Sequence, residues 1–259
     1  MATEPQRERR GIQSVERAVA ALRLLAHAGQ GMGVSELARA LGLPRGTIHG
    51  ILRTLALQGV VEQDHETGRY IVGAAMLPIG FAYLATSRLR AAALGPTHAL
   101  AARSRQSVRV GTLHRGEVLI VHDVSSDACR ASEVGGLVPA HATAVGKVLL
   151  AHLPGELSQP RAGDLERYTP ATITSVPRLR RELDEAPRRG WASSLGELSP
   201  GIASVAAPIA VGALQGSGAI EIVGPAERVC AAGSPRPELV TAVIDCARAI
   251  SRALGGPVQ

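Results

Sequence analysis

The sequence predicts an α+β protein of two domains, a small helical domain followed by a larger domain built on a mainly antiparallel sheet. At 259 residues the chain is longer than most single domains. Its apolar residues recur with the helical period of 3.6 up to about residue 106, and from residue 107 they alternate with the strand period of 2. Helical patterns flank the later strands, as in α+β folds.

Composition and charge exclude several classes of protein. No apolar run approaches the roughly 20 residues that span a bilayer, and the N-terminal stretch lacks the apolar core of a signal peptide. We therefore expect a cytoplasmic protein without membrane contact. The three cysteines, Cys129, Cys230 and Cys246, are odd in number and far apart, which favours reduced thiols over a disulfide framework. The net charge of +6 favours a polyanionic partner, although many solvated surfaces are equally basic.

The helical domain is predicted over residues 11–73. Residues 1–10 are charged and without periodicity, so we expect a disordered tail there. An amphipathic helix follows Ser14, which suits the capping position, and it ends at the glycine-rich stretch 28–33.

Two further helices with a sharp turn between them are predicted next. Ser35 can cap the first of them, Gly42 ends it, and Pro44 suits the start of the second. The second helix carries an apolar stripe with helical spacing: Ile48, Ile51, Leu52 and Leu55.

The other face of this second helix is the candidate DNA-reading surface. It carries Arg45, Thr47, His49 and Arg53. Gly46 and Gly50 add little bulk, so the helix can lie in a major groove, with Ser35 as a further contact. An ordinary helical pair with a solvated polar face is the alternative.

A predicted hairpin favours the DNA-binding interpretation. Residues 60–72 indicate two short strands joined by a polar turn at Thr67 and Gly68. Helix, turn, helix and hairpin together are typical of a winged helix-turn-helix, in which the wing, here with Arg69, reaches the DNA backbone.

Residues 74–94 indicate a connecting helix. Its apolar side, with Phe81 and Leu84, can pair with the same segment of a second subunit, or it can pack on its own domain. We expect pairing, because dimeric helix-turn-helix proteins match two half-sites on DNA.

The larger domain is predicted over residues 95–259. A helix at 97–106 precedes a hairpin formed by residues 107–113 and 117–123. Further strands are indicated at 203–208 and 218–222, and flanking helices at 177–189 and 237–254.

Small residues at the start of another helix, within residues 141–151, suggest an anion site. Residues Thr143 to Gly146 can present free backbone N–H groups, and Lys147 can add charge. Close packing of a small-residue helix start is the alternative interpretation.

The order and spacing of motifs across both domains resemble the IclR-type bacterial transcription regulators, over about residues 11–253. In the first domain the resemblance rests on residues 14–18, 37–38, 43–44, 47–49, 52–55 and Gly59. In the second it rests on residues 134–135, 139–151, 189–191, 196–197, 201–202, 205–209 and 218–220.

This resemblance implies a winged helix-turn-helix joined by a helix to an effector-binding domain with a GAF-like fold. It also implies a homodimer or homotetramer that binds a palindromic DNA operator, responds to a small-molecule effector and needs no cofactor. Gly46 and Gly50 depart from the small polar and basic residues common in the family, so contacts to DNA are fewer and each glycine weakens the helix by up to about 1 kcal/mol.

The resemblance also assigns candidate effector contacts. Ser194 and Ser204 lie where family members place polar ligand groups, and Ala144 and Val145, followed by Gly146, lie where they offer backbone donors. Glu197 is either a ligand group or a solvated loop carboxylate.

Glu221 is the residue that bears most directly on the effector. Strand alternation puts Ala219, Glu221 and Val223 on one face, and by the resemblance this strand lines the pocket. Members that bind small organic acids often have a small hydroxyl residue at the position of Glu221. A buried carboxylate repels an anion, so Glu221 is paired with an arginine or Lys147, or the ligand brings a donor, unless Glu221 points to solvent. We therefore expect an effector with hydroxyl or amine donors rather than a simple carboxylate such as pyruvate.

Catalytic functions find little support in the sequence. It contains no G-x-S-x-G, P-loop or zincin motif. His114, His122 and Asp123 fall on one hairpin, but this spacing is not specific for a metal. An enzyme that uses the small-molecule domain for catalysis is the alternative function, followed by a purely architectural DNA-binding protein.

Overall fold

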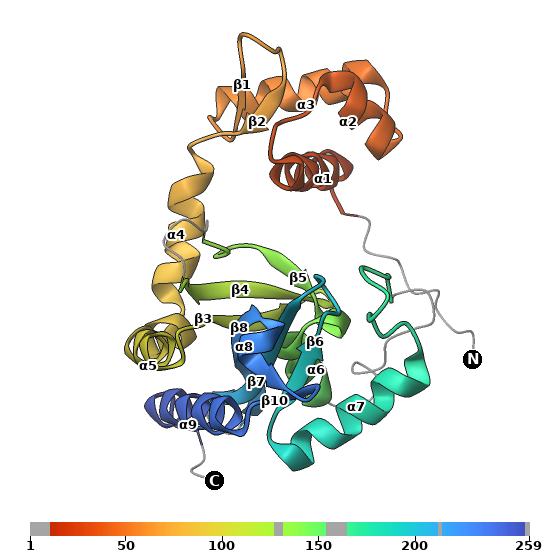
Figure 1. Ribbon diagram of the computed structural model, residues 1–259. Helices are drawn as coiled ribbons and strands as arrows, with labels where there is room; N and C mark the ends of the chain where they lie inside the picture. Colours follow the sequence, from red (N-terminus) through yellow and green to blue (C-terminus); the bar gives the residue numbers. More distant parts are fainter. Residues whose placement is uncertain (1–10, 127–131, 154–164, 212–213, 257–259) are drawn as a thin grey trace, which may run out of the picture. The chain divides into compact units, whose positions relative to one another are not determined.

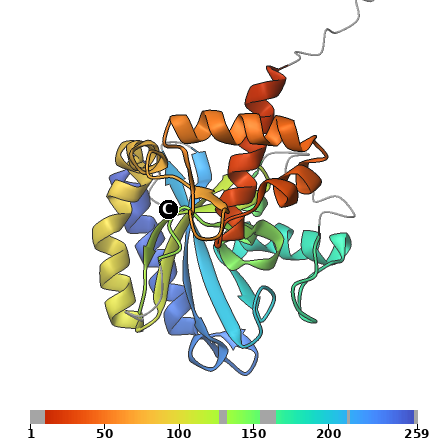
Figure 2. The same ribbon diagram turned by 90° about the horizontal axis from the view of Figure 1, so that it is seen from above.

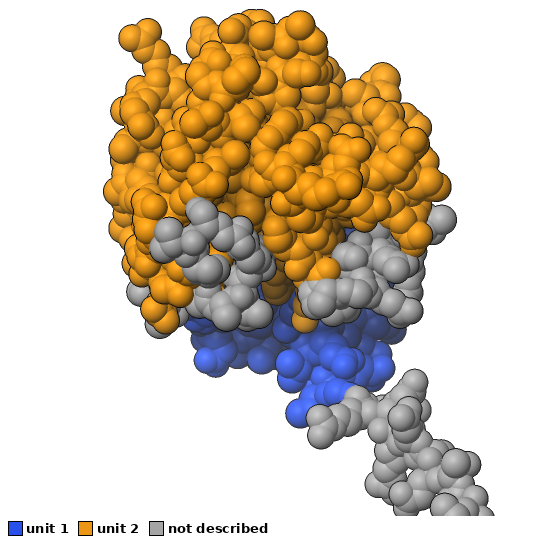
Figure 3. Space-filling model, turned by 90° about the horizontal axis from the view of Figure 1, so that it is seen from below, with its two compact units in different colours: residues 1–86 blue, residues 87–259 orange. Residues whose placement is uncertain are grey.

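A computed structural model describes residues 11–126, 132–153, 165–211 and 214–256. The chain forms two compact units, residues 1–86 and 87–259 (Figure 3). The tail expected over residues 1–10 and Cys129 lie outside the described residues. The first unit contains a helix-turn-helix and the second an antiparallel sheet with flanking helices, so the predicted α+β fold class is confirmed. Among the described helices, none is both long and apolar enough to span a lipid bilayer.

The first unit is a set of helices with a two-stranded hairpin (Figure 1). Its elements are α1 (Gln13–Ala28), α2 (Val34–Leu41), α3 (Arg45–Leu57), β1 (Val61–Gln63), β2 (Tyr70–Val72) and α4 (Met76–Thr86). Its core contains Leu25, Leu37, Ala38, Ile48, Leu52, Val61 and Tyr70. Gly42 ends α2 with φ of 62°, a left-handed conformation that glycine adopts without strain.

Neither predicted serine cap is present. Helix α1 begins at Gln13, so Ser14 lies inside its first turn. At the start of α2, the Glu36 carboxylate accepts a hydrogen bond of 2.9 Å from the Gly33 N–H. A carboxylate suits this position because it brings negative charge to the positive end of the helix dipole. Ser35 instead accepts a hydrogen bond from the Arg45 side chain.

The connecting segment is also different from the prediction, because the helix expected over 74–94 ends early. Helix α4 ends at Thr86, and α5 (Arg88–Ser104) begins after Ser87, whose Oγ accepts a hydrogen bond of 3.2 Å from the Arg90 N–H. Helix α5 then continues through Pro96. Its buried side is continuous across this proline, which explains why no break occurs there: Leu89, Ala93, Thr97 and Leu100.

The second unit is a six-stranded antiparallel sheet between two layers of helices (Figures 1 and 2). The strand order is β5 (Leu137–Pro139), β4 (Glu117–Val124), β3 (Ser107–His114), β8 (Leu214–Pro225), β7 (Ile202–Val211) and β6 (Ala192–Leu195). Helices α5 and α9 (Pro237–Ala253) pack on one face. Helices α6 (Ala144–Ala151) and α7 (Val176–Arg189) pack on the other. Short elements complete the unit: η1 (Ala140–Ala142), α8 (Ala226–Val229), β9 (Cys230–Ala231) and β10 (Ser234–Pro235).

Sheet register brings charged residues together on the α6 face. The predicted hairpin of β3 and β4 is confirmed, with Arg109 opposite Asp123. On its other side Arg109 lies opposite Glu221 of β8. Strand β6 pairs with β7 and places Ser194 opposite Ser204.

Candidate functional site

The outer face of α3 carries a row of polar side chains. Arg45, His49 and Arg53 are exposed and four residues apart, so they lie along one side of the helix. Thr47 is not in this row: it is half-buried and lines an apolar groove beside Ile51. Arg45, which also donates to Ser35, ties α3 to the start of α2. The row is an unobstructed positive surface on the second helix of the helix-turn-helix.

The structure gives Arg69 a structural role that sequence reasoning missed. Its guanidinium donates to Glu36 Oε2 at 2.8 Å and to the Gly31 carbonyl at 3.0 Å. The Gly33 N–H and then Arg69 hold the pKa of Glu36 below its usual range. Because these contacts occupy Arg69, it fastens the wing to the start of α2 and is a poor candidate for the phosphate contact that the sequence suggested.

An apolar groove of about 680 Å³ lies on the first unit. It is lined by residues of α1, α3 and α4, among them Val15, Val19, Ile51, Leu55 and Ile79. Two of the lining side chains, Val15 and Ile79, are exposed, and α4 also exposes Leu77, Phe81 and Tyr83. Exposed apolar surface on this scale is typical of an interaction face.

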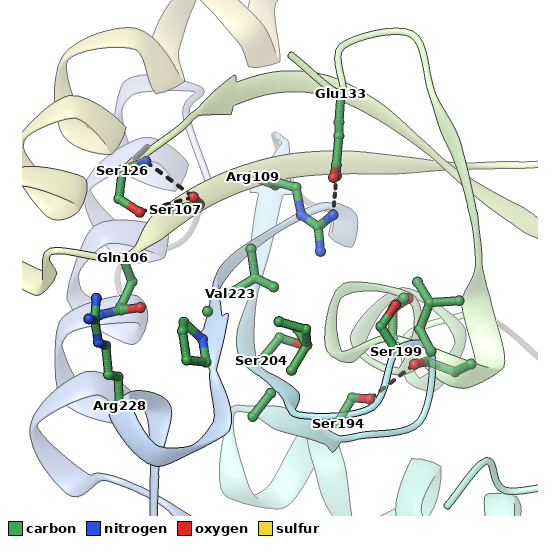
Figure 4. Close-up of a pocket in the computed structure, with 17 residues that line it drawn as sticks. Gln106, Ser107, Arg109, Ser126, Glu133, Ser194, Ser199, Ser204, Val223 and Arg228 are labelled. Atoms are coloured by element: carbon green, nitrogen blue, oxygen red, sulfur yellow. Dashed lines mark hydrogen bonds and ion pairs between the residues drawn. The ribbon is translucent and has the colours of Figure 1, made fainter. Parts of the chain in front are cut away.

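The second unit contains a pocket of about 510 Å³ (Figure 4). Arg109 and Glu133 lie on one side of it and Ser194 on the other. Its polar lining residues are Gln106, Ser107, Arg109, Ser126, Glu133, Thr143, Ser194, Ser199, Ser204 and Arg228. The pocket therefore brings together the predicted residues Ser194 and Ser204 with several side chains that the sequence did not single out.

The start of α6 is already occupied by a carboxylate from the chain itself. Thr143 caps the helix by accepting a hydrogen bond of 3.3 Å from the Gly146 N–H. Glu221 Oε2 accepts one of 3.3 Å from the Val145 N–H. Gly146 also serves close packing, because a Cβ there would lie 2.2 Å from the Ala140 carbonyl oxygen. Ala144, Val145 and Gly146 are buried, and the pocket lining reaches only as far as Ala142 and Thr143.

Glu221 is fully buried and paired with Arg109, so the solvent-facing alternative is wrong. Its Oε1 lies 2.6 Å from Arg109 Nη2. The other terminal nitrogen, Nη1, forms an ion pair with Glu133 Oε2. Arg109 is itself 5% exposed. The guanidinium thus joins two carboxylates from distant parts of the chain, and it is the arginine partner that the sequence required for Glu221.

Lys147 does not supply charge to this site. Its ammonium group donates to Glu197 Oε1 at 2.6 Å and to the Ser193 carbonyl at 3.0 Å, and both charged side chains are buried. Glu197 is therefore neither solvated nor part of the pocket lining. The Glu197 carbonyl accepts a hydrogen bond of 2.6 Å from Thr172. Together these contacts fix the loop that follows β6.

The hairpin residues considered as metal ligands diverge. His122 contacts the Thr97 hydroxyl of α5 at 2.9 Å, on the opposite face of the sheet from Arg109. Burial, and then the charges of Arg90 and His98, lower the pKa of His122. Within the described residues no group of three potential ligands is close enough to hold a metal.

The pocket residues that sequence reasoning missed are Gln106, Arg109, Glu133 and Arg228. For Arg109 the sequence did contain a signal. It lies between Val108 and Val110 in a strand, so its side chain points to the opposite face of the sheet from these two apolar residues. Glu133 comes from a turn that carries no periodic pattern.

Two family models match the sequence. One, described as the bacterial transcriptional regulator IclR C-terminal domain, matches residues 81–252, and the other, described as the IclR helix-turn-helix domain, matches residues 14–65. The glycerol operon regulatory proteins of Streptomyces coelicolor and Streptomyces griseus are 47% and 46% identical, and each match covers 95% of this chain and 98% of the relative. The transcriptional repressor IclR of Escherichia coli is 30% identical, with 95% and 91% covered.

Solved structures agree with these matches. An IclR transcriptional regulator from Alicyclobacillus acidocaldarius superposes with a TM-score of 0.77 at 26% identity, covering 95% of this chain and all of the other. An IclR homologue from Microbacterium hydrocarbonoxydans, complexed with 4-hydroxybenzoate, superposes with a TM-score of 0.75 at 25% identity, covering 93% and 98%.

Proposed function

The chain belongs to the IclR family of bacterial transcription regulators, and on this premise we propose that it binds a palindromic operator in double-stranded DNA under the control of a small metabolite. The family models and named relatives are regulators, so the chain is a transcription regulator rather than an enzyme. Several relatives are named as repressors, which supports repression of the target genes. Operator binding also requires the cytoplasm, where bacterial DNA lies.

The row on α3 is the proposed base-reading surface. Arg53 and His49 extend from the helix, and no contact from the rest of the first unit occupies the Arg53 guanidinium among the described residues. Arginine reads guanine through two hydrogen bonds in the major groove. Gly46 and Gly50 have open space around their Cα atoms, so the helix backbone can approach DNA closely on this side.

We propose a homodimer as the minimum assembly, and a homotetramer as two such dimers. Helix α4 exposes Leu77, Ile79 and Phe81, and the neighbouring groove on the same unit has room for apolar side chains of a second copy. A palindromic site offers two equivalent half-sites, which a two-fold symmetric pair of α3 helices matches.

The pocket supports an effector rich in hydroxyl groups. The Glu133 carboxylate, which lines the pocket, accepts hydrogen bonds from hydroxyl donors, whereas it repels another carboxylate. The relatives at 47% and 46% identity are named for the glycerol operon. We therefore propose a small polyol of glycerol metabolism as effector and genes of glycerol use as targets.

The first prediction concerns Arg53. Replacing it by Ala removes a guanine contact and costs about 1–3 kcal/mol of operator binding, with relaxed sequence preference at one base pair. Fluorescence anisotropy with operator and scrambled duplexes measures both quantities. Arg248→Ala, which removes an exposed arginine of α9, is the control and leaves operator affinity unchanged. Unchanged operator binding by Arg53→Ala would refute this surface.

The second prediction concerns assembly. Sedimentation velocity at micromolar concentration shows a species of at least twice the 26.8 kDa of one chain. Ile79→Glu shifts it toward monomer, because a charge is placed in an apolar contact. Leu57→Glu alters another exposed apolar residue of the first unit, outside the groove lining, and leaves the assembly intact. A monomer with full operator affinity contradicts the proposal.

The third prediction concerns the effector. In a thermal-shift panel, glycerol or a related polyol stabilises the wild-type chain and pyruvate does not. Glu221→Ser removes the buried carboxylate that holds Arg109 Nη2, so the guanidinium at the pocket gains positive charge and the variant gains a carboxylate response. Glu117→Ser, an exposed site at the start of β4, behaves as wild type. Stabilisation only by simple monocarboxylates, unaffected by Glu221→Ser, contradicts the proposed effector class.

A further inference from the structure

We propose that Glu133 is a specificity-determining residue that keeps anions out of the effector pocket by occupying the guanidinium of Arg109. This inference rests on the proposed function, because it concerns the same pocket. It goes beyond the effector class, because it assigns the selection against anions to a single side chain. Replacing that side chain tests the assignment.

Arg109 has the features of an anion-binding group. It lines the pocket, 95% of its surface is buried, and Nη2 is held by Glu221 at 2.6 Å. Its Nε atom is buried and has no hydrogen-bond partner in the described part of the chain. Nη1 is therefore the terminal nitrogen through which the guanidinium can bind a charged group at the pocket wall.

Glu133 stands between such a ligand and the guanidinium. Its carboxylate pairs with Arg109 Nη1 at the pocket wall, where Figure 4 shows the two side chains meeting. With Glu221 on the other terminal nitrogen, two negative charges face one positive charge. The guanidinium is thus already compensated, and a ligand anion beside Arg109 would meet the Glu133 carboxylate, whose repulsion in a partly buried site is stronger than in water.

Of the two carboxylates, Glu133 is the one that can be changed without dismantling the sheet. Its side chain is 33% exposed, whereas that of Glu221 is 0% exposed and bonded to the start of α6. The segment that carries Glu133 is held by hydrogen bonds that do not involve the Glu133 side chain. The Glu133 N–H donates to Asp123 Oδ2 at 3.1 Å, and the Gly135 N–H donates to the Ile120 carbonyl at 2.8 Å.

The arrangement favours neutral hydroxylated ligands for a simple reason. A hydroxyl group can donate to the Glu133 carboxylate, whereas an ionised carboxylate can only accept and is repelled by it. Replacing Glu133 by Gln removes one negative charge while keeping the size of the side chain. The positive charge of the Arg109 guanidinium is then less compensated on the side that faces the pocket.

The test is titration calorimetry of the full-length chain with inorganic phosphate and, separately, with glycerol. Glu133→Gln binds phosphate about tenfold more tightly than wild type, the size expected for one charge-assisted hydrogen bond gained. Glu133→Ala also binds phosphate more tightly than wild type. This second variant keeps the test valid if one of the two substitutions impairs folding. Equal phosphate affinity in wild type and both variants, each with a wild-type thermal transition, overturns the proposal.

A second cation in the pocket can also bind phosphate, so its contribution has to be distinguished from that of Arg109. Arg228 is exposed and lines the same pocket, so it offers phosphate another site. The double variant Glu133→Gln with Arg228→Gln keeps the gain if Arg109 binds the anion. Loss of the gain in the double variant assigns it to Arg228 and overturns the proposal.

The glycerol arm separates this inference from the proposed effector class. If neither wild type nor variants bind glycerol but Glu133→Gln still gains phosphate affinity, the role of Glu133 stands and the polyol effector falls. If glycerol binds wild type and phosphate affinity never changes, the effector class stands and the role of Glu133 is wrong.

Discussion

The buried carboxylate of Glu221 is the constraint on which the second unit, residues 87–259, depends. It lies between the backbone N–H groups at the start of α6 and the guanidinium of Arg109, so it links a helix to two central strands. A charge with 0% exposure is tolerated only with partners of this kind. The consequence for function is that the helix start, which suits anions in general, is filled by the protein, and a ligand must interact with what remains of the pocket.

The two units use their basic residues differently. In the second unit the two buried cations near the site are tied to carboxylates, Arg109 to Glu221 and Glu133, and Lys147 to Glu197, whereas Arg228 at the pocket is exposed. In the first unit Arg69 is likewise tied, to Glu36, whereas the row on α3 remains exposed. Exposed arginines thus lie where a polyanion is expected, whereas the buried cations beside the pocket are compensated by carboxylates, a difference that net charge alone does not reveal.

Much of the fold was predictable because it depends on local pattern. The stripe of α3, the hairpin of β3 and β4 and the strand around Glu221 follow from periodicity. The serine caps at Ser14 and Ser35 were wrong because cap preference is weak beside competing partners such as Glu36. Arg109 and Glu133 could not be joined from sequence, because their contact depends on sheet register and on a turn without periodicity. Thr47 stays a predicted DNA contact, although it is half-buried and lines the apolar groove beside the row on α3.

The most direct test of the central claim is a double-mutant cycle on Arg109→Gln and Glu221→Gln, measured by chemical denaturation of the full-length chain. Arg109→Gln leaves the Glu221 carboxylate buried without a counter-charge and loses about 3–5 kcal/mol of unfolding free energy, whereas Glu221→Gln loses less, because Glu133 still compensates Arg109. The double variant then loses clearly less than the sum of the two. Strictly additive losses, or single variants as stable as wild type, would show that the pair does not hold the start of α6 and the sheet together.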